Sequence, residues 1–288
     1  MTEGVRHVKF AARECGEQRS RGQNEKLVKT LCAMNECRVA PCQERNEKSA
    51  MQYQNQPAEI FEPAPETRFE HGRRLVIRTL RERSGLGARY ANLTLDDFKP
   101  TESQRAAFEA ARQFCADFAA RKNRGEGLLF AGNCGSGKTM LAAAMAGEII
   151  EKSELDETRV GFAAMLGADQ WNTSEVIVKF ANVVDLLERL RCSFDKNDSE
   201  KGSAREILAG YERAPLLILD DLGAEKPSGW SGERLYELIN YRYSELLPTI
   251  FTTNCRADEI QTRLGERLFD RIRSTCRYIP LTVPKSLR

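Results

Sequence analysis

The chain has 288 residues, of which 44 are lysine or arginine and 42 are aspartate or glutamate, so its formal net charge is only +2. This balance excludes a strongly basic protein that coats nucleic acid, and any contact with DNA must depend on a local basic patch. No run approaches the eighteen apolar residues of a membrane helix, and the charged N-terminus lacks the apolar stretch of a signal peptide. We therefore expect a cytoplasmic protein with no membrane contact.

The first 66 residues are rich in glutamine, asparagine and charged side chains, and they end in the proline-spaced segment QPAEIFEPAPE. This composition is typical of a partly disordered region followed by an extended linker. Within it, NEKLVKTLCAM has the spacing of a short amphipathic helix. We therefore predict a small, partly disordered helical N-terminal region over residues 1–66.

Nine cysteines are scattered along the chain, an odd number that argues for reduced thiols rather than a disulfide framework. Four of them lie in the N-terminal region with the spacing C-x₁₆-C-x₄-C-x₄-C, namely Cys15, Cys32, Cys37 and Cys42. Zinc sites usually contain a tight C-x₂-C pair, which this spacing lacks. We expect free thiols at these positions, with a zinc site as the alternative.

A helical connector is predicted over residues 67–99. In RFEHGRRLVIRTLRERSG, the apolar residues Phe69, Val76 and Leu80 recur with helical spacing, and Gly85 ends the pattern. The segment is also strongly basic.

From residue 100 to 288 the sequence alternates between helical patterns and short apolar runs, which are GLLFAG, EVIVKFA, PLLILDD, PTIFTTN and CRYIPLTV. Runs that are apolar on both faces and separated by helix-length segments are typical of a buried parallel sheet. The sequence therefore predicts an α/β core domain.

The first run is followed by GNCGSGKT, which fits the P-loop pattern at all four fixed positions, and then by the strong helical pattern MLAAAMAGEII. Glycines let the backbone turn its N–H groups toward a phosphate, the lysine reaches the β- and γ-phosphates, and the threonine hydroxyl binds Mg²⁺. The predicted ATP-binding residues are Gly132, Asn133, Cys134, Gly135, Ser136, Gly137, Lys138 and Thr139.

Two aspartates follow the buried run LLIL, at the edge of a parallel sheet where ligands of open α/β proteins bind. We expect Asp220 to join Thr139 in the Mg²⁺ shell. Asp221 is the candidate to orient or deprotonate the attacking water. Asn254 ends the run PTIFTT, and its amide can both donate and accept a hydrogen bond to that water.

Four segments together resemble the AAA+ helicase loaders of the DnaC/DnaI type: GLLFAGNCGSGKTMLAAAMA, LLILDDLGAEKPSGW, ELINYRYSELLPTIFTTN and LGERLFDRIR. The resemblance covers residues 86–288 and implies an AAA+ P-loop core with a parallel five-stranded sheet that binds ATP between neighbouring subunits. It also implies self-association into a spiral or ring on a replicative DNA helicase, which is placed on single-stranded DNA. Residues 1–66 match nothing specific in the family and are the candidate helicase-docking segment.

By position, the resemblance makes Lys138 and Thr139 the Walker A contacts, Asp220 and Asp221 the Walker B pair, and it makes Asn254 the first sensor. Many AAA+ proteins carry glutamate where Asp221 stands. Its shorter side chain fits a slow, switch-like ATPase.

The resemblance gives two arginines a catalytic role. Arg271, in the segment FDRIR, resembles an arginine finger that reaches the ATP of the adjacent subunit, which makes hydrolysis depend on assembly. Arg288, in the final KSLR, resembles the second sensor, which contacts the γ-phosphate in its own subunit. A solvated basic face around Arg271 and a solvated tail around Arg288 are the alternatives.

For DNA, the segment VIVKFANVVDLLERLRCSFDK places Arg189, Arg191 and Lys196 away from its apolar face. Single-strand binders need such a cationic groove. The basic run RRLVIRTLRER is an equal candidate, for DNA or for the helicase.

Two other functions compete with an ATP-dependent loader. A P-loop metabolic kinase would need a phosphate-acceptor pocket and an arginine-rich lid, and the sequence suggests neither. A transposition ATPase of the IstB type, acting on duplex DNA, shares the same core and is the closest alternative.

Overall fold

The computed structural model describes residues 67–122, 124–166, 177–195, 203–225 and 228–283. All of them belong to one unit, Ala64–Arg288, whereas a separate unit, Met1–Pro63, lies outside the described residues. The helix, the partial disorder and the four cysteines predicted for residues 1–66 therefore lie outside the described residues. Lys196 and Arg288 also lie outside the described residues.

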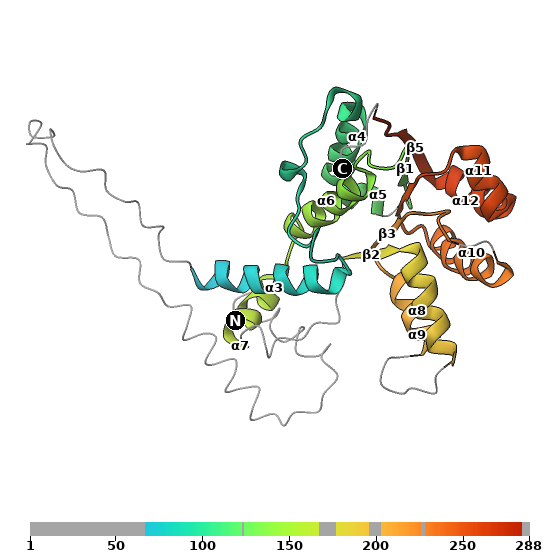
Figure 1. Cartoon of the computed structure of the whole chain (residues 1–288). Helices are drawn as coiled ribbons and strands as arrows, with labels where there is room; N and C mark the ends of the chain where they lie inside the picture. The colour runs from blue at the N-terminus through green and yellow to red at the C-terminus, as the bar shows by residue number, and fades with distance from the viewer. Residues whose placement is uncertain (1–66, 123, 167–176, 196–202, 226–227, 284–288) are drawn as a thin grey trace, which may run out of the picture. The chain divides into compact units, whose positions relative to one another are not determined.

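Five parallel strands form one sheet in the order β2-β3-β4-β1-β5 (Figure 1). The strands are β1 (Gly127–Ala131), β2 (Val178–Asn182), β3 (Leu216–Asp220), β4 (Thr249–Thr253) and β5 (Cys276–Pro280). In β1, Phe130 lies beside Thr252 of β4 and Ile279 of β5. This arrangement confirms the predicted α/β class and its parallel five-stranded sheet.

Helices cover both faces of the sheet and connect its strands. They are α3 (Arg68–Ser84), α4 (Arg105–Ala116), α5 (Phe118–Lys122), α6 (Lys138–Glu151), α7 (Glu157–Leu166), α8 (Val183–Asp195), α9 (Ala204–Glu212), α10 (Gly229–Ser244), α11 (Ala257–Leu264) and α12 (Glu266–Thr275). Two short 3₁₀ helices, Leu95–Asp97 and Glu102–Gln104, precede α4. None of the described helices is long and apolar enough to cross a membrane.

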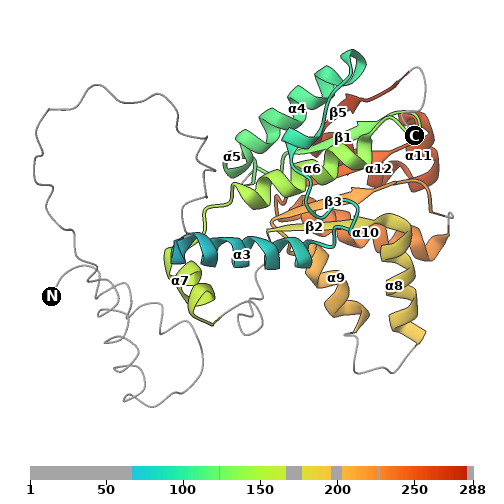
Figure 2. The same ribbon diagram turned by 60° about the vertical axis from the view of Figure 1, so that its left-hand side comes forward.

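The central strands are apolar on both faces because each face has its own layer of helices (Figure 2). Leu128 and Phe130 pack in a core cluster with residues of α3, α4, α6 and α7. Leu129, which points the other way, packs with residues of α8 to α12. Every residue of β1, β3 and β4 is buried, as their continuous apolar runs predict.

Strand β5 differs from its prediction because it lies at the edge of the sheet. Ile279 is its one buried residue, and Tyr278 is 50% exposed. The run CRYIPLTV is apolar enough to suggest burial on both faces, but β5 pairs with β1 on one side only.

Helix α3 begins and ends where the sequence indicates. The Thr67 side chain accepts a hydrogen bond from the Glu70 amide in a capping box, and Gly85 ends the helix with a left-handed φ of 85°. Val76 and Leu80 are buried as predicted, whereas Phe69 is 49% exposed, so its place on the inner face is wrong. Buried packing begins one turn later, at the first buried position of the helix, Gly72.

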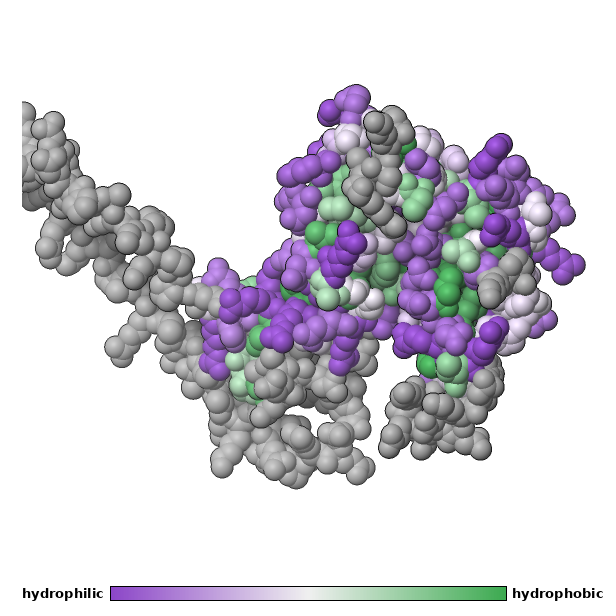
Figure 3. Space-filling view, viewed as in Figure 1, coloured by the Kyte–Doolittle hydropathy of each residue, from purple (hydrophilic) through white to green (hydrophobic). Residues whose placement is uncertain are grey.

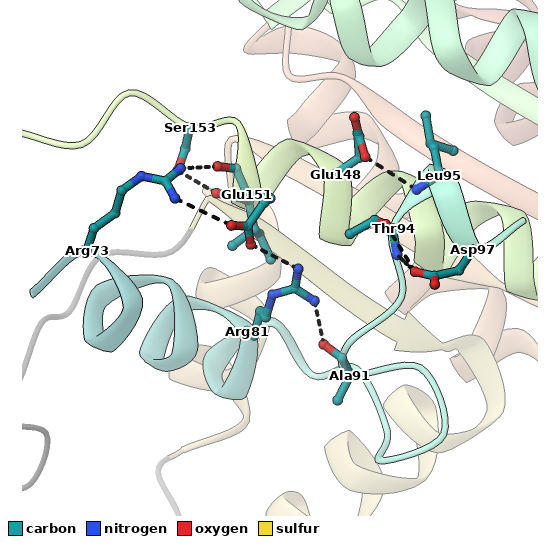
Figure 4. A network of polar contacts seen from close by, with 10 residues as sticks. Arg73, Arg81, Ala91, Thr94, Leu95, Asp97, Glu148, Glu151 and Ser153 are labelled. Carbon is teal, nitrogen blue, oxygen red and sulfur yellow. Dashed lines mark hydrogen bonds and ion pairs between the residues drawn. The ribbon is translucent and has the colours of Figure 1, made fainter. Parts of the chain in front are cut away.

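Polar contacts tie α3 to α6, the helix that follows the P-loop (Figure 4). Arg73 contacts the side chain and carbonyl of Glu151, and Arg81 donates to the same carboxylate at 3.1 Å and to the Ala91 carbonyl at 2.8 Å. The outer face of α3 is hydrophilic (Figure 3). Helix α3 therefore packs against α6 and belongs to the same compact unit as the sheet.

Candidate active site

The P-loop joins β1 to α6 and needs glycine at three of its positions. Gly135 and Gly137 have φ angles of 76° and 91°, which side chains other than glycine rarely adopt. Gly132 is required for a different reason, because a Cβ atom there would lie 1.9 Å from the carbonyl oxygen of Leu281. The loop therefore turns tightly and packs directly on the segment after β5.

Lys138 begins α6 and turns its ammonium group back into the loop. Its Nζ donates to the carbonyl oxygens of Gly132 at 2.9 Å and Asn133 at 2.8 Å, and to the Asn254 Oδ1 at 2.8 Å. The residue is 5% exposed. A buried cation held by several oxygens at the mouth of a glycine-rich turn is suited to bind phosphate oxygens.

Asp220 ends β3 beside the threonine of the P-loop. Burial raises the pKa of the Asp220 carboxyl above its ordinary value, and hydrogen bonds from Thr252 and Thr139 oppose that increase. The Thr252 Oγ1 donates to the Asp220 Oδ1 at 2.6 Å. Together, the Thr139 hydroxyl and the Asp220 carboxylate offer the oxygen ligands that Mg²⁺ prefers, so this donor set fits the metal.

Asn254 connects the lysine of the P-loop to the second aspartate. Its Oδ1 accepts from Lys138, and its Nδ2 donates to the Asp221 Oδ1 at 2.8 Å. Asp221 has a φ of 58°, a left-handed conformation that aspartate tolerates better than most residues. The predicted Walker A lysine, first sensor and Walker B aspartate thus form one continuous chain of hydrogen bonds.

This proximity follows from strand order, because β3, β4 and β1 are consecutive neighbours in the sheet. Asp220, Asn254 and the P-loop stand at the carboxyl ends of these three strands. Parallel strands bring their carboxyl ends to the same edge, where open α/β sheets bind ligands.

Arg271 lies elsewhere, on the surface formed by α10 and α12. Its guanidinium donates to the Asn240 Oδ1 at 2.7 Å and the Tyr236 hydroxyl at 2.9 Å, and it lies over the rings of Tyr236 and Tyr243. Within the described part of the chain, these contacts do not bring Arg271 to the P-loop of its own subunit.

The candidate DNA residues are also engaged in contacts within the chain. Arg189 donates to the Tyr211 hydroxyl at 3.1 Å, and Arg191 lies over the ring of Trp230 with 5.1 Å to its centroid. Their side chains therefore support the packing of α8 against α9 and α10, whatever else they do.

Three polar residues around the site were not predicted from the sequence. The Gln104 side chain donates to the Ser136 carbonyl of the P-loop at 2.9 Å, while Thr252 and Thr253 bond the turn after β3. Two adjacent threonines ending the apolar run PTIF were the available signal for the second pair. No sequence signal pointed to Gln104, because the segment that carries it is remote from the P-loop in sequence.

A family model described as "IstB-like ATP binding protein" matches residues 94–284, which is most of the described unit. The chain belongs to this family. The matched region contains the P-loop, both aspartates and Asn254, so the family match and the geometry agree on an ATP-binding protein of the AAA+ type.

The curated relatives of the chain include replicative helicase loaders. The chain is 24% identical to "Replicative helicase loader DnaC" of Escherichia coli K12, over 66% of this chain and 67% of that protein. It is 28% identical to "Replicative helicase loader DnaI" of Bacillus subtilis, over 61% of this chain but only 47% of that protein.

Among solved structures, a crystal structure of the DnaC helicase loader is 30% identical, with a TM-score of 0.54, and the match covers 68% of this chain and 99% of that one. These findings confirm the resemblance to DnaC/DnaI-type loaders. They do not favour the IstB-type transposition alternative over it.

No cluster of three or more histidine, cysteine, aspartate or glutamate side chains suited to a metal occurs among the described residues. The candidate zinc cysteines lie outside them.

Proposed function

We propose that this chain is an ATPase that loads a replicative DNA helicase onto single-stranded DNA and uses slow ATP hydrolysis as its switch. The hydrogen-bonded chain Lys138–Asn254–Asp221, beside Thr139 and Asp220, is the observation that carries the catalytic part. The relatives named as replicative helicase loaders support the choice of a helicase as partner.

In this proposal, backbone N–H groups of the P-loop hold the β- and γ-phosphates of ATP. Lys138 exchanges its contacts with the Gly132 and Asn133 carbonyls for contacts with phosphate oxygens. Thr139 and Asp220 hold Mg²⁺, which neutralises charge on the phosphates when it is bound.

Asp221 and Asn254 position the attacking water. The amide of Asn254 already lies between Lys138 and Asp221, so a water held by these two side chains would face a γ-phosphate bound to Lys138. Phosphoryl transfer depends mainly on such positioning and on charge stabilisation. The short side chain of Asp221 reaches less far than glutamate, which supports a low basal rate.

Arg271 completes the site of a neighbouring subunit. Its partners Asn240, Tyr236 and Tyr243 are all neutral, so a phosphate on another subunit can compete for the guanidinium without breaking an ion pair. Self-association into a spiral or ring would then switch hydrolysis on.

Arg288 is proposed as the second sensor. The Asn133 amide bonds both backbone groups of Val283, donating to its carbonyl at 2.8 Å and accepting from its N–H at 3.1 Å, which brings the chain past the P-loop shortly before Arg288. Deleting Arg288 alone should lower the ratio of the ADP to the ATP dissociation constant without unfolding the protein. An unchanged ratio would remove this role.

For single-stranded DNA we propose Arg189, Arg191 and Lys196, with α3 as the competing surface. A pocket of about 460 Å³ beside α3 is lined by Arg74 and Arg78, among others. Paired substitutions to alanine in α8 (Arg189, Arg191) and in α3 (Arg74, Arg78) separate the two surfaces by their effect on DNA affinity and its salt dependence.

Helicase docking is assigned to residues 1–66. A chain that lacks residues 1–66 should keep its ATPase activity but lose helicase binding, whereas retained binding would place docking on the core. The whole proposal is tested by loading purified helicase onto circular single-stranded DNA with wild-type protein and ATP. No stimulation of loading, together with binding to duplex DNA and a transposase, would favour the IstB-type function.

A further inference from the structure

Two threonines end β4, and neither has an assigned role in the family chemistry described above. Thr252 and Thr253 are both fully buried. The Thr252 Oγ1 accepts a hydrogen bond from the Asp221 N–H at 3.0 Å and donates to the Asp220 Oδ1 at 2.6 Å. Thr252 therefore contacts both members of the aspartate pair through one oxygen atom.

The Thr252 hydroxyl accepts one of these hydrogen bonds and donates the other. A backbone N–H can only donate, so the Thr252 oxygen must accept from Asp221, and its single hydroxyl proton is directed to Asp220. One hydroxyl thus orients the proposed Mg²⁺ ligand and links it to the residue proposed to position water.

The same threonine also holds the strained turn. Asp221 has its left-handed φ of 58° between two hydrogen bonds to residue 252, one to the side chain and one from the Leu222 N–H to the Thr252 carbonyl at 2.8 Å. A left-handed non-glycine residue persists when its surroundings determine it in this way. In this conformation the Asp221 carboxylate meets the Asn254 amide.

We propose that Thr252 is a positioning residue that orients Asp220 to bind Mg²⁺ and Asp221 to hold the attacking water. The inference rests on the proposed ATPase function and adds a residue to that site. Thr253 provides a matched control, because its hydroxyl donates to the Leu222 carbonyl at 2.6 Å and contacts neither aspartate side chain.

The test compares Thr252→Val, Thr253→Val and Thr252→Ser in the full chain. ATP affinity is measured with a fluorescent ATP analogue in Mg²⁺ and again in EDTA, and single-turnover hydrolysis is measured in parallel. Thr252→Val should weaken Mg²⁺-dependent binding about 10- to 100-fold, as loss of an outer partner of a metal ligand does, with affinity in EDTA unchanged. Thr252→Ser should restore it, and Thr253→Val should keep the wild-type Mg²⁺ dependence.

The inference would be overturned if Thr252→Val and Thr253→Val changed Mg²⁺-dependent ATP affinity equally. It would also be overturned if Thr252→Val lost as much ATP affinity in EDTA as in Mg²⁺. If Thr252→Val does not fold, Thr252→Ala is used in its place, because it removes the same hydroxyl with a smaller side chain. In an Asp220→Asn background, Thr252→Val should have little further effect on Mg²⁺-dependent affinity, and a full additional loss would also contradict the role. Failure of the proposed function looks different, because the wild-type protein itself would then show no Mg²⁺-dependent ATP binding.

Discussion

Replacing Asn254 by aspartate tests the hydrogen-bonded chain at the centre of the site. The substitution keeps the size of the side chain and the oxygen that accepts from Lys138 at 2.8 Å. It replaces the donor that lies 2.8 Å from the Asp221 Oδ1 by a second carboxylate oxygen. The variant therefore loses one hydrogen bond to a charged group and gains a contact between like charges.

The magnitude follows from these two changes. A hydrogen bond to a charged group is worth about 1.5–3 kcal/mol, so Asn254→Ala should slow hydrolysis about 10- to 100-fold. Two unit charges at about 4 Å repel by about 1–4 kcal/mol between bulk water and a protein surface, so Asn254→Asp should be slower than Asn254→Ala. ATP affinity should change less than the rate, because the P-loop N–H groups and the Lys138 side chain that are proposed to hold the phosphates are the same in both variants.

Single-turnover hydrolysis at saturating ATP gives the rate, and equilibrium titration gives the ATP dissociation constant for each variant. The expected order of rates is wild type, then Asn254→Ala, then Asn254→Asp. Wild-type hydrolysis by Asn254→Asp, or a faster rate than that of Asn254→Ala, would refute the placement of Asn254 between Lys138 and Asp221.

Three further predictions concern the same domain. Lys138→Ala should weaken ATP binding about 100-fold or more in a titration, while thermal unfolding shows that the fold persists. Lys138→Met should weaken ATP binding equally if the charge of the lysine is what matters. Unchanged ATP affinity would contradict the P-loop assignment. Arg271→Ala should keep ATP binding but lose the hydrolysis that assembly stimulates. Mixing it with Asp221→Asn subunits should restore part of the hydrolysis rate. If the two variants co-assemble and the rate does not recover, Arg271 does not act on the ATP of a neighbouring subunit. Arg242→Met should lower the free energy of unfolding by about 1–3 kcal/mol for each buried carbonyl that it leaves without a donor. The buried guanidinium donates to the carbonyls of Tyr211, Glu212, Ala214 and Pro248. A total loss below about 1 kcal/mol in denaturant titration would show that these carbonyls find other partners.

Much of the site was predictable because its residues occupy positions that local sequence defines. The P-loop, Asp220 and Asn254 each end a short apolar run, and parallel strands place such ends at one edge of the sheet. The residue types then specify the chemistry. Strand order decides whether these ends meet, and here the resemblance to a known family supplied what periodicity could not.

Contacts between distant segments were not predictable. The Asn133 amide bonds Val283, 150 positions away, and nothing at a variable P-loop position signals that partner. Arg271 was placed on a face that points away from the core, yet α10 supplies two tyrosine rings and an amide that hold it. Helical periodicity separates inner from outer faces but does not show which outer residues a neighbouring helix covers.

A helicase loader that depends on ATP must form a nucleotide-dependent complex with its helicase, so this complex is the most direct test of the proposed function. Purified replicative helicase is mixed with the full chain in ATP, ADP or no nucleotide, and complex formation is measured by size-exclusion chromatography with light scattering. We expect a complex whose stoichiometry or stability differs between ATP and ADP, and we expect Lys138→Ala to abolish this difference. Absence of a complex in every nucleotide state, for a chain that binds ATP and Mg²⁺ normally, would contradict the proposed function.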